Sequence, residues 1–169
     1  MAGRCTLIKS VLNTYPLYSM QTTILPSMVL RNIEKNCRQF LWNKVDRSRY
    51  ISRTSWDNVT RPMGVGGLGI RRLKDWNVAF MAKLCWKILT NPNKLWVLLF
   101  KENFLRRTNL FDCTVHSYNS PIWRDILQGR ALLQKGLIIG IDNGRSTSLW
   151  YHHWVGSGPI YKLIDKDIP

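Results

Sequence analysis

The stretch KDWNVAFMAKLCWKIL, residues 74–89, decides how this chain folds. At 100° per residue its apolar side chains occupy most of the circumference of a helix, and a helix of that kind belongs in the interior. The stretch therefore predicts a long central helix over 74–89, against which other elements pack. The following Asn91-Pro92-Asn93 predicts where that helix stops.

Further helices are predicted on both sides of this segment. Helical spacing of apolar residues indicates helices over 4–14, 27–42, 94–105 and from Ser120-Pro121 to Gly136, with a short helix or turn opening at Ser55-Trp56. Pro16 is expected to end the first helix, and Pro26 suits the first turn of the second. The clearest segregation is in 27–42, where the apolar side chains fall within an arc of about 120°. Those apolar residues are Val29, Leu30, Ile33, Cys37, Phe40 and Leu41.

Two segments do not follow helical spacing. The glycine-rich GVGGLG at 64–69 is expected to be a flexible loop, and apolar runs on both sides of Asp142-Asn143-Gly144 predict a β-hairpin. The predicted fold class is therefore mostly α. A helical bundle over 1–110 would be followed by a small helix plus β-hairpin module over 120–155 and a tail over 156–169.

The charge of the chain points to a polyanionic partner. There are 25 Lys and Arg residues against 10 Asp and Glu, a formal charge of +15 on 169 residues. With 45% hydrophobic residues the chain can still bury a core, which excludes a disordered basic tail. The net charge is +6 over 1–60, +7 over 61–120 and +2 over 121–169, so the basic surface belongs to the first two thirds. Nucleic acid is the predicted partner.

Two basic clusters are the candidate nucleic-acid-binding residues. One is the polar face of the helix predicted over 27–42, and the other directly precedes the central helix. A ridge of cations can meet a row of phosphates, in an RNA–DNA hybrid or a duplex, without reading bases. Each cluster can equally be an ordinary solvated face, and the sequence leaves both interpretations open. The six residues are Arg31, Lys35 and Arg38 in the first cluster and Arg71, Arg72 and Lys74 in the second.

No catalytic residue is predicted. Two-metal phosphoryl transfer needs several carboxylates around ions about 4 Å apart. This chain has no two adjacent aspartates. Asp165 and Asp167 are separated by one residue and lie close to the last residue of the sequence. It also contains no G-x-S-x-G and no H-E-x-x-H motif, and no strand is expected before GVGGLG, as a dinucleotide fingerprint requires. We therefore expect no cofactor and no small-molecule substrate.

The cysteines indicate free thiols in a reducing compartment, either nucleus or cytoplasm. Cys5, Cys37, Cys85 and Cys113 form no C-x-x-C pair. A zinc site from Cys113, His116, His152 and His153 is a weaker alternative, because the spacing matches no usual ligand pattern. No apolar run approaches the roughly 20 residues that span a bilayer, so no membrane partner is expected.

Several stretches resemble one family. They are GRCTLIKSVLNTYPLYSM (3–20), Leu25-Pro26, IEKNCRQFLW (33–42), Ser55-Trp56, GGLGIRRLKDWNVAFMAKLCWKI (66–88), and Trp123 through Gly129-Arg130 to Asn143-Gly144, Trp150 and Trp154. In their order and spacing they are similar to the polyprotein of plant LINE-type (non-LTR) retrotransposons, just downstream of the reverse transcriptase palm. Related sequences are often described as ribonuclease H-like or reverse transcriptase zinc-binding domain proteins. The resemblance covers almost the whole chain.

The resemblance implies a fragment without catalysis. The catalytic aspartates of such an RNA-directed DNA polymerase would precede Met1, which would be an internal methionine of a longer frame, and its zinc-binding and ribonuclease H regions would follow Pro169. Residues 1–110 would be a thumb-like region that helps to grip a template–primer duplex. Asp142 and His153 depart from residues common in relatives, glycine and an acidic residue. The alternative is a decayed remnant that acts at most as a structural or protein-interaction module. The oligomeric state is open.

Overall fold

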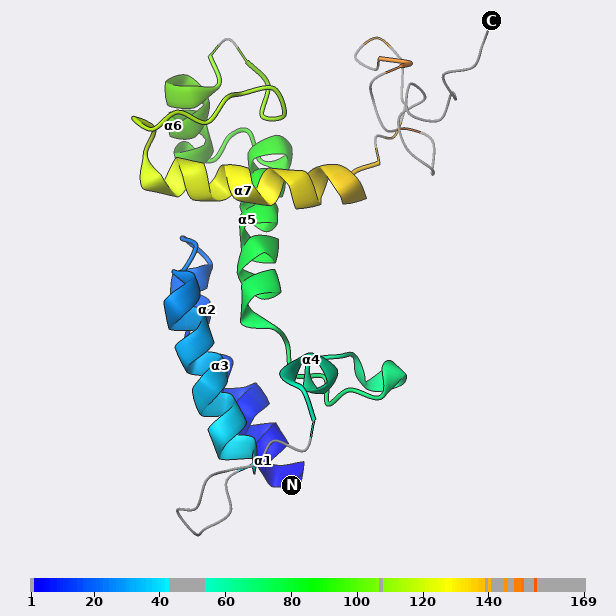
Figure 1. Ribbon diagram of the computed structural model, residues 1–169. Helices are drawn as coiled ribbons and strands as arrows, with labels where there is room; N and C mark the ends of the chain where they lie inside the picture. The colour runs from blue at the N-terminus through cyan, green and yellow to red at the C-terminus, as the bar shows by residue number, and fades with distance from the viewer. Residues whose placement is uncertain are drawn as a thin grey trace, which may run out of the picture.

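The computed structural model describes residues 2–42, 54–106, 108–138, 140, 145, 148–150 and 154. This part of the chain is helical and contains no strand, as a mostly α fold class predicts (Figure 1). The predicted hairpin turn at 142–144 lies outside the described residues, so nothing here supports a β-hairpin module. The helices are α1 (Ala2–Leu7), α2 (Leu17–Met20), α3 (Ser27–Trp42), α4 (Trp56–Val59), α5 (Leu73–Thr90), α6 (Leu95–Phe104) and α7 (Pro121–Gly136), with a π-helix η1 (Ile8–Leu12) after α1 and a 3-10 turn η2 (Met63–Val65) after α4.

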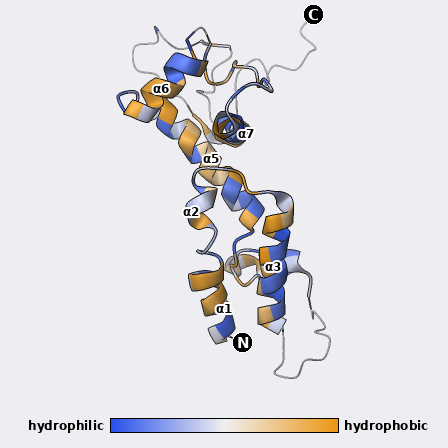
Figure 2. Ribbon diagram, turned by 90° about the vertical axis from the view of Figure 1, so that its left-hand side faces the viewer, coloured by the Kyte–Doolittle hydropathy of each residue, from blue (hydrophilic) through white to orange (hydrophobic). Residues whose placement is uncertain are grey.

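Helix α5 is the central element, as its sequence predicts, but it is not covered on all sides as its apolar circumference suggested. Its buried residues recur mainly every three to four positions along one side, whereas Trp86 and Leu89 are 46% and 38% exposed. Different neighbours cover the buried side in its two halves. Figure 1 shows α1 to α4 gathered around its N-terminal end and α6 and α7 at its C-terminal end. In Figure 2, turned by 90°, α5 again links these two groups. None of the described helices is both long and apolar enough to cross a membrane.

Three apolar clusters hold the elements together. The largest joins the C-terminal half of α5 to α6 and α7 and contains Cys85, Ile88, Val97, Leu110, Cys113, Trp123, Ile126 and Leu127. A second joins η1, α3 and α4 through Ile8, Cys37, Leu41, Val59 and Ile70. A third, of Met20, Leu30 and Leu73, ties α2 and α3 to the start of α5. Five of the eight tryptophans pack in or against these clusters (Trp42, Trp56, Trp76, Trp96 and Trp123), as expected of mainly structural side chains.

Helix α3 has the predicted bounds, but it buries less of its apolar arc than expected. Leu30, Cys37 and Leu41 are buried, whereas Val29 and Phe40 keep 42% and 39% of their surface exposed. The neighbours of α3 are α1, η1 and α5, together with Val59 of α4, and their contacts bury Leu30, Cys37 and Leu41 but leave Val29 and Phe40 uncovered. The border of the apolar arc therefore remains at the surface.

The N-terminal segment is helical, as predicted, but it is not one continuous α-helix. The segment expected as one helix over 4–14 is α-helical only to Leu7 and continues as the π-helix η1. The loop expected between Pro16 and Pro26 contains the short helix α2. Helix α7 begins at Pro121 as predicted, but the Ser120 side chain makes no capping hydrogen bond.

A turn at Thr23–Leu25 is fixed by side chains from α5 and α7. Asn77, which is buried, donates from Nδ2 to the carbonyl oxygens of Met20 (3.0 Å) and Thr23 (2.9 Å), and its Oδ1 accepts from the Leu25 amide (2.8 Å). Asp125 of α7 accepts from the Thr23 hydroxyl (2.7 Å) and the Ile24 amide (2.9 Å). These bonds connect α7 to the N-terminal helices. Whether the chain divides near residue 110 stays a prediction.

The glycine-rich segment is a turn fixed by backbone hydrogen bonds, in contrast to the expected flexible loop. Its amides from 65 to 69 all donate to backbone carbonyls, two of them to Val59 and Arg61. Gly66 and Gly69 have φ of 85° and 64°, and a Cβ on Gly67 would lie 1.9 Å from the Arg61 carbonyl oxygen. Glycine is required here by positive φ and close backbone approach. The same internal bonds leave these amides no free donor for a phosphate.

Candidate nucleic-acid interface

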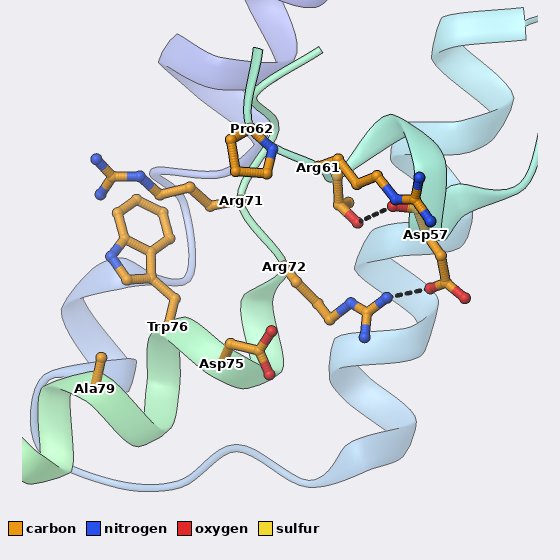
Figure 3. Close-up of a pocket in the computed structure, with 9 residues that line it drawn as sticks. Asp57, Arg61, Pro62, Arg71, Arg72, Asp75, Trp76 and Ala79 are labelled. Atoms are coloured by element: carbon orange, nitrogen blue, oxygen red, sulfur yellow. Dashed lines mark hydrogen bonds and ion pairs between the residues drawn. The ribbon is translucent and has the colours of Figure 1, made fainter. Parts of the chain in front are cut away.

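An open groove of about 700 Å³ lies where α4, the glycine-rich turn and the start of α5 meet (Figure 3). It brings together three arginines, two aspartates and one tryptophan. The residues that line it are Asp57, Thr60, Arg61, Pro62, Arg71, Arg72, Asp75, Trp76 and Ala79.

Local structure explains why these side chains converge. The Ser55 hydroxyl caps α4 by accepting from the Asn58 amide at 3.3 Å, which sets the direction of the chain through Asp57. The glycine-rich turn then folds the chain back, because the amides of Leu68 and Gly69 donate to the carbonyls of residues 59 and 61. This reversal places the Arg71-Arg72 pair beside Arg61, although ten residues separate them in sequence.

Arg72 forms an ion pair with Asp57 on one side of the groove. The side chains of Arg72 and Asp57 are 40% and 75% exposed. An ion pair this open to solvent contributes little stability, because water and salt screen it. Arg72 is therefore held toward α4 but can exchange its partner for another anion.

Arg71 lies over an aromatic ring on the other side of the groove. Its guanidinium carbon is 4.7 Å from the centroid of the Trp76 ring, within the range of a cation–π contact. That ring in turn stacks on Phe80, with centroids 5.9 Å apart and planes 24° apart. Figure 3 shows Arg71 and Trp76 on one side of the extended segment, with Arg72 and Asp57 on the other.

Two residues of the second predicted cluster, Arg71 and Arg72, therefore line the groove. Lys74 is exposed on the first turn of α5 and is not among the lining residues. Arg61 lines the groove as well and was missed by sequence reasoning, because it stands alone before Pro62. The only signal for it was its position just ahead of the glycine-rich segment.

The first predicted cluster is only partly an exposed ridge. Arg31 and Lys35 are exposed, but Arg38 is half-buried, with its guanidinium carbon 5.8 Å from the Trp56 ring centroid. Arg38 also donates from Nε to the Glu34 carbonyl at 3.4 Å. Trp56 directly precedes Asp57, so α4 contacts a cation from each predicted cluster. One cation of each cluster, Arg38 and Arg72, thus lies against α4.

Three of the four thiols, those of Cys37, Cys85 and Cys113, are buried, which disfavours a reactive thiolate. Burial raises the pKa of Cys37 to about 11 and that of Cys85 to about 12, and it also raises the pKa of Cys113. Cys113 is buried, whereas His116 is exposed and stacks on Tyr118. The other two residues of the zinc alternative, His152 and His153, lie outside the described residues. Within those residues no three His, Cys, Asp or Glu side chains are grouped to hold a metal ion.

The proteins to which this chain is similar include two from Arabidopsis thaliana. One, named "Putative ribonuclease H protein", is 31% identical over 172 residues, which cover 99% of this chain and 28% of that protein. The other, named "Uncharacterized mitochondrial protein", is 29% identical over 141 residues, covering 83% of this chain and 92% of that protein. The chain thus spans little more than a quarter of the first relative. No protein-family model and no solved structure matches the chain.

Proposed function

We propose that this chain is a non-catalytic, nucleic-acid-binding segment of a plant retrotransposon reverse transcriptase polyprotein. The observation that carries the proposal is the groove in which Arg61, Arg71 and Arg72 converge beside Trp76, on a chain of net charge +15. Cations supply most of the sequence-independent affinity for a phosphate backbone. In the parent protein the segment would help to hold a template–primer duplex, in the nucleus or the cytoplasm.

The similarity supports the proposed origin. One relative carries ribonuclease H in its name, and such a domain belongs to the polyprotein family that the sequence resembles. That relative is much longer than the matched segment, so its whole activity is no guide to what this segment does alone. The order of the short motifs, from the N-terminal stretch to Trp154, is what links the chain to the region beyond the polymerase palm.

We also propose that the segment is not itself an enzyme. Asp57 pairs with Arg72, and Asp125 accepts two hydrogen bonds from the turn at Thr23–Ile24. Asp125 thus has structural partners and Asp57 faces a cation, and among the described residues no group of three His, Cys, Asp or Glu side chains is placed to hold a metal ion. Purified protein should show no primer extension and no nuclease activity with magnesium or manganese. Reproducible activity that is lost on changing Asp165 or Asp167 would contradict this part of the proposal.

The binding proposal is tested with a labelled RNA–DNA hybrid and fluorescence anisotropy between about 50 and 200 mM salt. Affinity should fall steeply as salt rises, because bound cations release counterions from the phosphates. Changing Arg61, Arg71 and Arg72 together to Ala should flatten the log–log salt slope by up to about three units. A matched control removes three exposed cations elsewhere, Lys94, Arg124 and Lys135, and should change the slope less. Absence of binding at low salt, or an equal effect of both triple variants, would defeat the proposal.

A second candidate is an interaction module, favoured by one exposed apolar stripe. Leu7, Val11, Tyr15 and Tyr18 follow one another along the N-terminal helices and are 50%, 55%, 87% and 87% exposed. Large exposed apolar patches mark protein contacts. If the hybrid-binding test fails while polar substitutions along this stripe abolish self-association, the interaction module is the better description.

A further inference from the structure

We propose that the groove holds a single unpaired strand, with a base stacked on Arg71 and Trp76 and the backbone held by Arg61 and Arg72. This inference rests on the proposed nucleic-acid binding and specifies which form of nucleic acid enters the groove. Three features carry it: the size of the groove, the supported aromatic platform and the placement of the cations.

The size of the groove favours one strand. The groove offers a space of about 700 Å³ that is open to solvent, so it can take up single nucleotides but does not enclose a whole duplex. A duplex could therefore lay only its outer backbone across the opening. One or two unstacked nucleotides fit, since sites of 300 to 1,000 Å³ typically hold ligands of that order.

Trp76 and Arg71 form a supported surface on which a base can stack. Phe80 supports Trp76 from within the helix, and Arg71 covers the ring with its planar guanidinium. Arg71 is itself exposed, so a base can stack on the outer side of the guanidinium. Proteins that bind single strands use aromatic side chains and arginine planes in this way, and every base offers a π-face.

Two further cations lie near this stacking surface. Arg61 and Arg72 line the same groove and project on the opposite side of the extended segment from the Arg71–Trp76 pair (Figure 3). A phosphate can displace Asp57 from Arg72, because that ion pair is open to solvent. A strand entering the groove thus meets charge at its backbone and a stacking surface at its base, which duplex DNA cannot use without unpairing.

The test compares four ligands on the full chain: a single strand, the same strand with abasic positions, a DNA duplex and an RNA–DNA hybrid. The intact single strand should bind roughly five- to a hundredfold more tightly than the abasic strand, as loss of base stacking predicts. Arg71→Lys keeps the charge and loses the planar guanidinium, so it should remove most of this difference. Trp76→Leu should do the same, and Trp86→Leu, at an exposed tryptophan outside the groove, should not.

The outcomes separate the two proposals. If hybrid and duplex bind with a strong salt dependence but the intact and abasic strands bind equally, nucleic-acid binding stands and the stacking site is wrong. Failure of all four ligands at low salt would overturn both. Arg71→Lys keeps the inference testable even if Trp76→Leu unfolds, because Arg71 is exposed and lies outside the apolar clusters.

Discussion

Gly129 of α7 lies directly against Ala82 of α5, so closely that a Cβ on Gly129 would be 2.2 Å from the Ala82 amide nitrogen. The Cys85 thiol, one turn along α5, donates to the Ile126 carbonyl at 3.1 Å. Backbone therefore meets backbone where the two helices cross (Figure 1). Any side chain at 129 would force the helices apart.

The Gly129→Ala variant should accordingly be less stable, by at least about 2 kcal/mol, because overpacking of a close contact commonly costs 1–3 kcal/mol. The Tm should fall by several degrees, as measured by circular dichroism. Gly136→Ala, at the last residue of α7 with no atom within 4 Å of the added Cβ, is the matched control. It should be neutral or slightly stabilising, since Ala is the better helix former. Equal stability of the two variants would mean that α5 and α7 do not cross this closely.

Asn77→Leu should destabilise the chain by about 2–4 kcal/mol. It leaves the Leu25 amide and the carbonyls of Met20 and Thr23 without their partner, and each buried unsatisfied group costs about 1–3 kcal/mol. Urea unfolding measures the loss. Asn32→Leu, at an exposed position of α3, should stay within about 0.5 kcal/mol of the parent. A small effect at Asn77 would show that the turn at Thr23–Leu25 does not depend on α5.

Asp57→Asn should strengthen nucleic-acid binding. The change frees Arg72 from its ion pair and removes one negative charge from the groove. An exposed pair is worth about 0.2–1 kcal/mol, so the gain should be a few-fold in Kd at low salt and smaller at high salt. Asp112→Asn, an exposed carboxylate outside the groove, is the control. Weaker binding by Asp57→Asn would indicate that Asp57 positions Arg72 rather than competing for it.

The exposed basic face of α3, which carries Arg31 and Lys35, should contribute less to nucleic-acid binding than the groove does. Changing Arg31 and Lys35 together to Ala should leave the free energy of unfolding within about 0.5 kcal/mol, because both are exposed. It should flatten the salt slope of hybrid binding by up to about two units. Arg38→Ala differs, since it loses the contact with the Trp56 ring, and should cost about 0.5–1 kcal/mol of stability. If the double variant binds hybrid as the parent does, this face is merely solvated.

The buried thiols should make the fold sensitive to alkaline pH. Cys37 and Cys85 ionise near 11 and 12 in the folded chain, against an ordinary 9.0, because burial disfavours the thiolate. The folded state therefore keeps protons that the unfolded state releases, and stability should fall as pH rises from about 9 toward 11 or 12. Urea unfolding at a series of pH values measures this. At about pH 8, iodoacetamide should modify Cys85 only after unfolding; rapid labelling of the folded chain would contradict its burial.

Local sequence determined most of the helices. The bounds of α3 and α5 follow from apolar spacing and from proline and asparagine signals, because each depends on neighbours within a few turns. The basic character of the surface also follows directly from composition. The π-helical continuation at Ile8 was not predictable, since its apolar spacing resembles that of an α-helix.

Only the tertiary structure decided where the cations act. Arg61 joins Arg71 and Arg72 because the glycine-rich turn reverses the chain, which no local pattern encodes. Arg38 leaves the exposed ridge because Trp56, 18 positions along the chain, packs against it. Likewise, the contact between Gly129 and Ala82 depends on two helices separated by α6 and a long loop. The spacing of apolar residues determines which face of a helix is apolar. Which residues pack against its polar face is decided by long-range contacts.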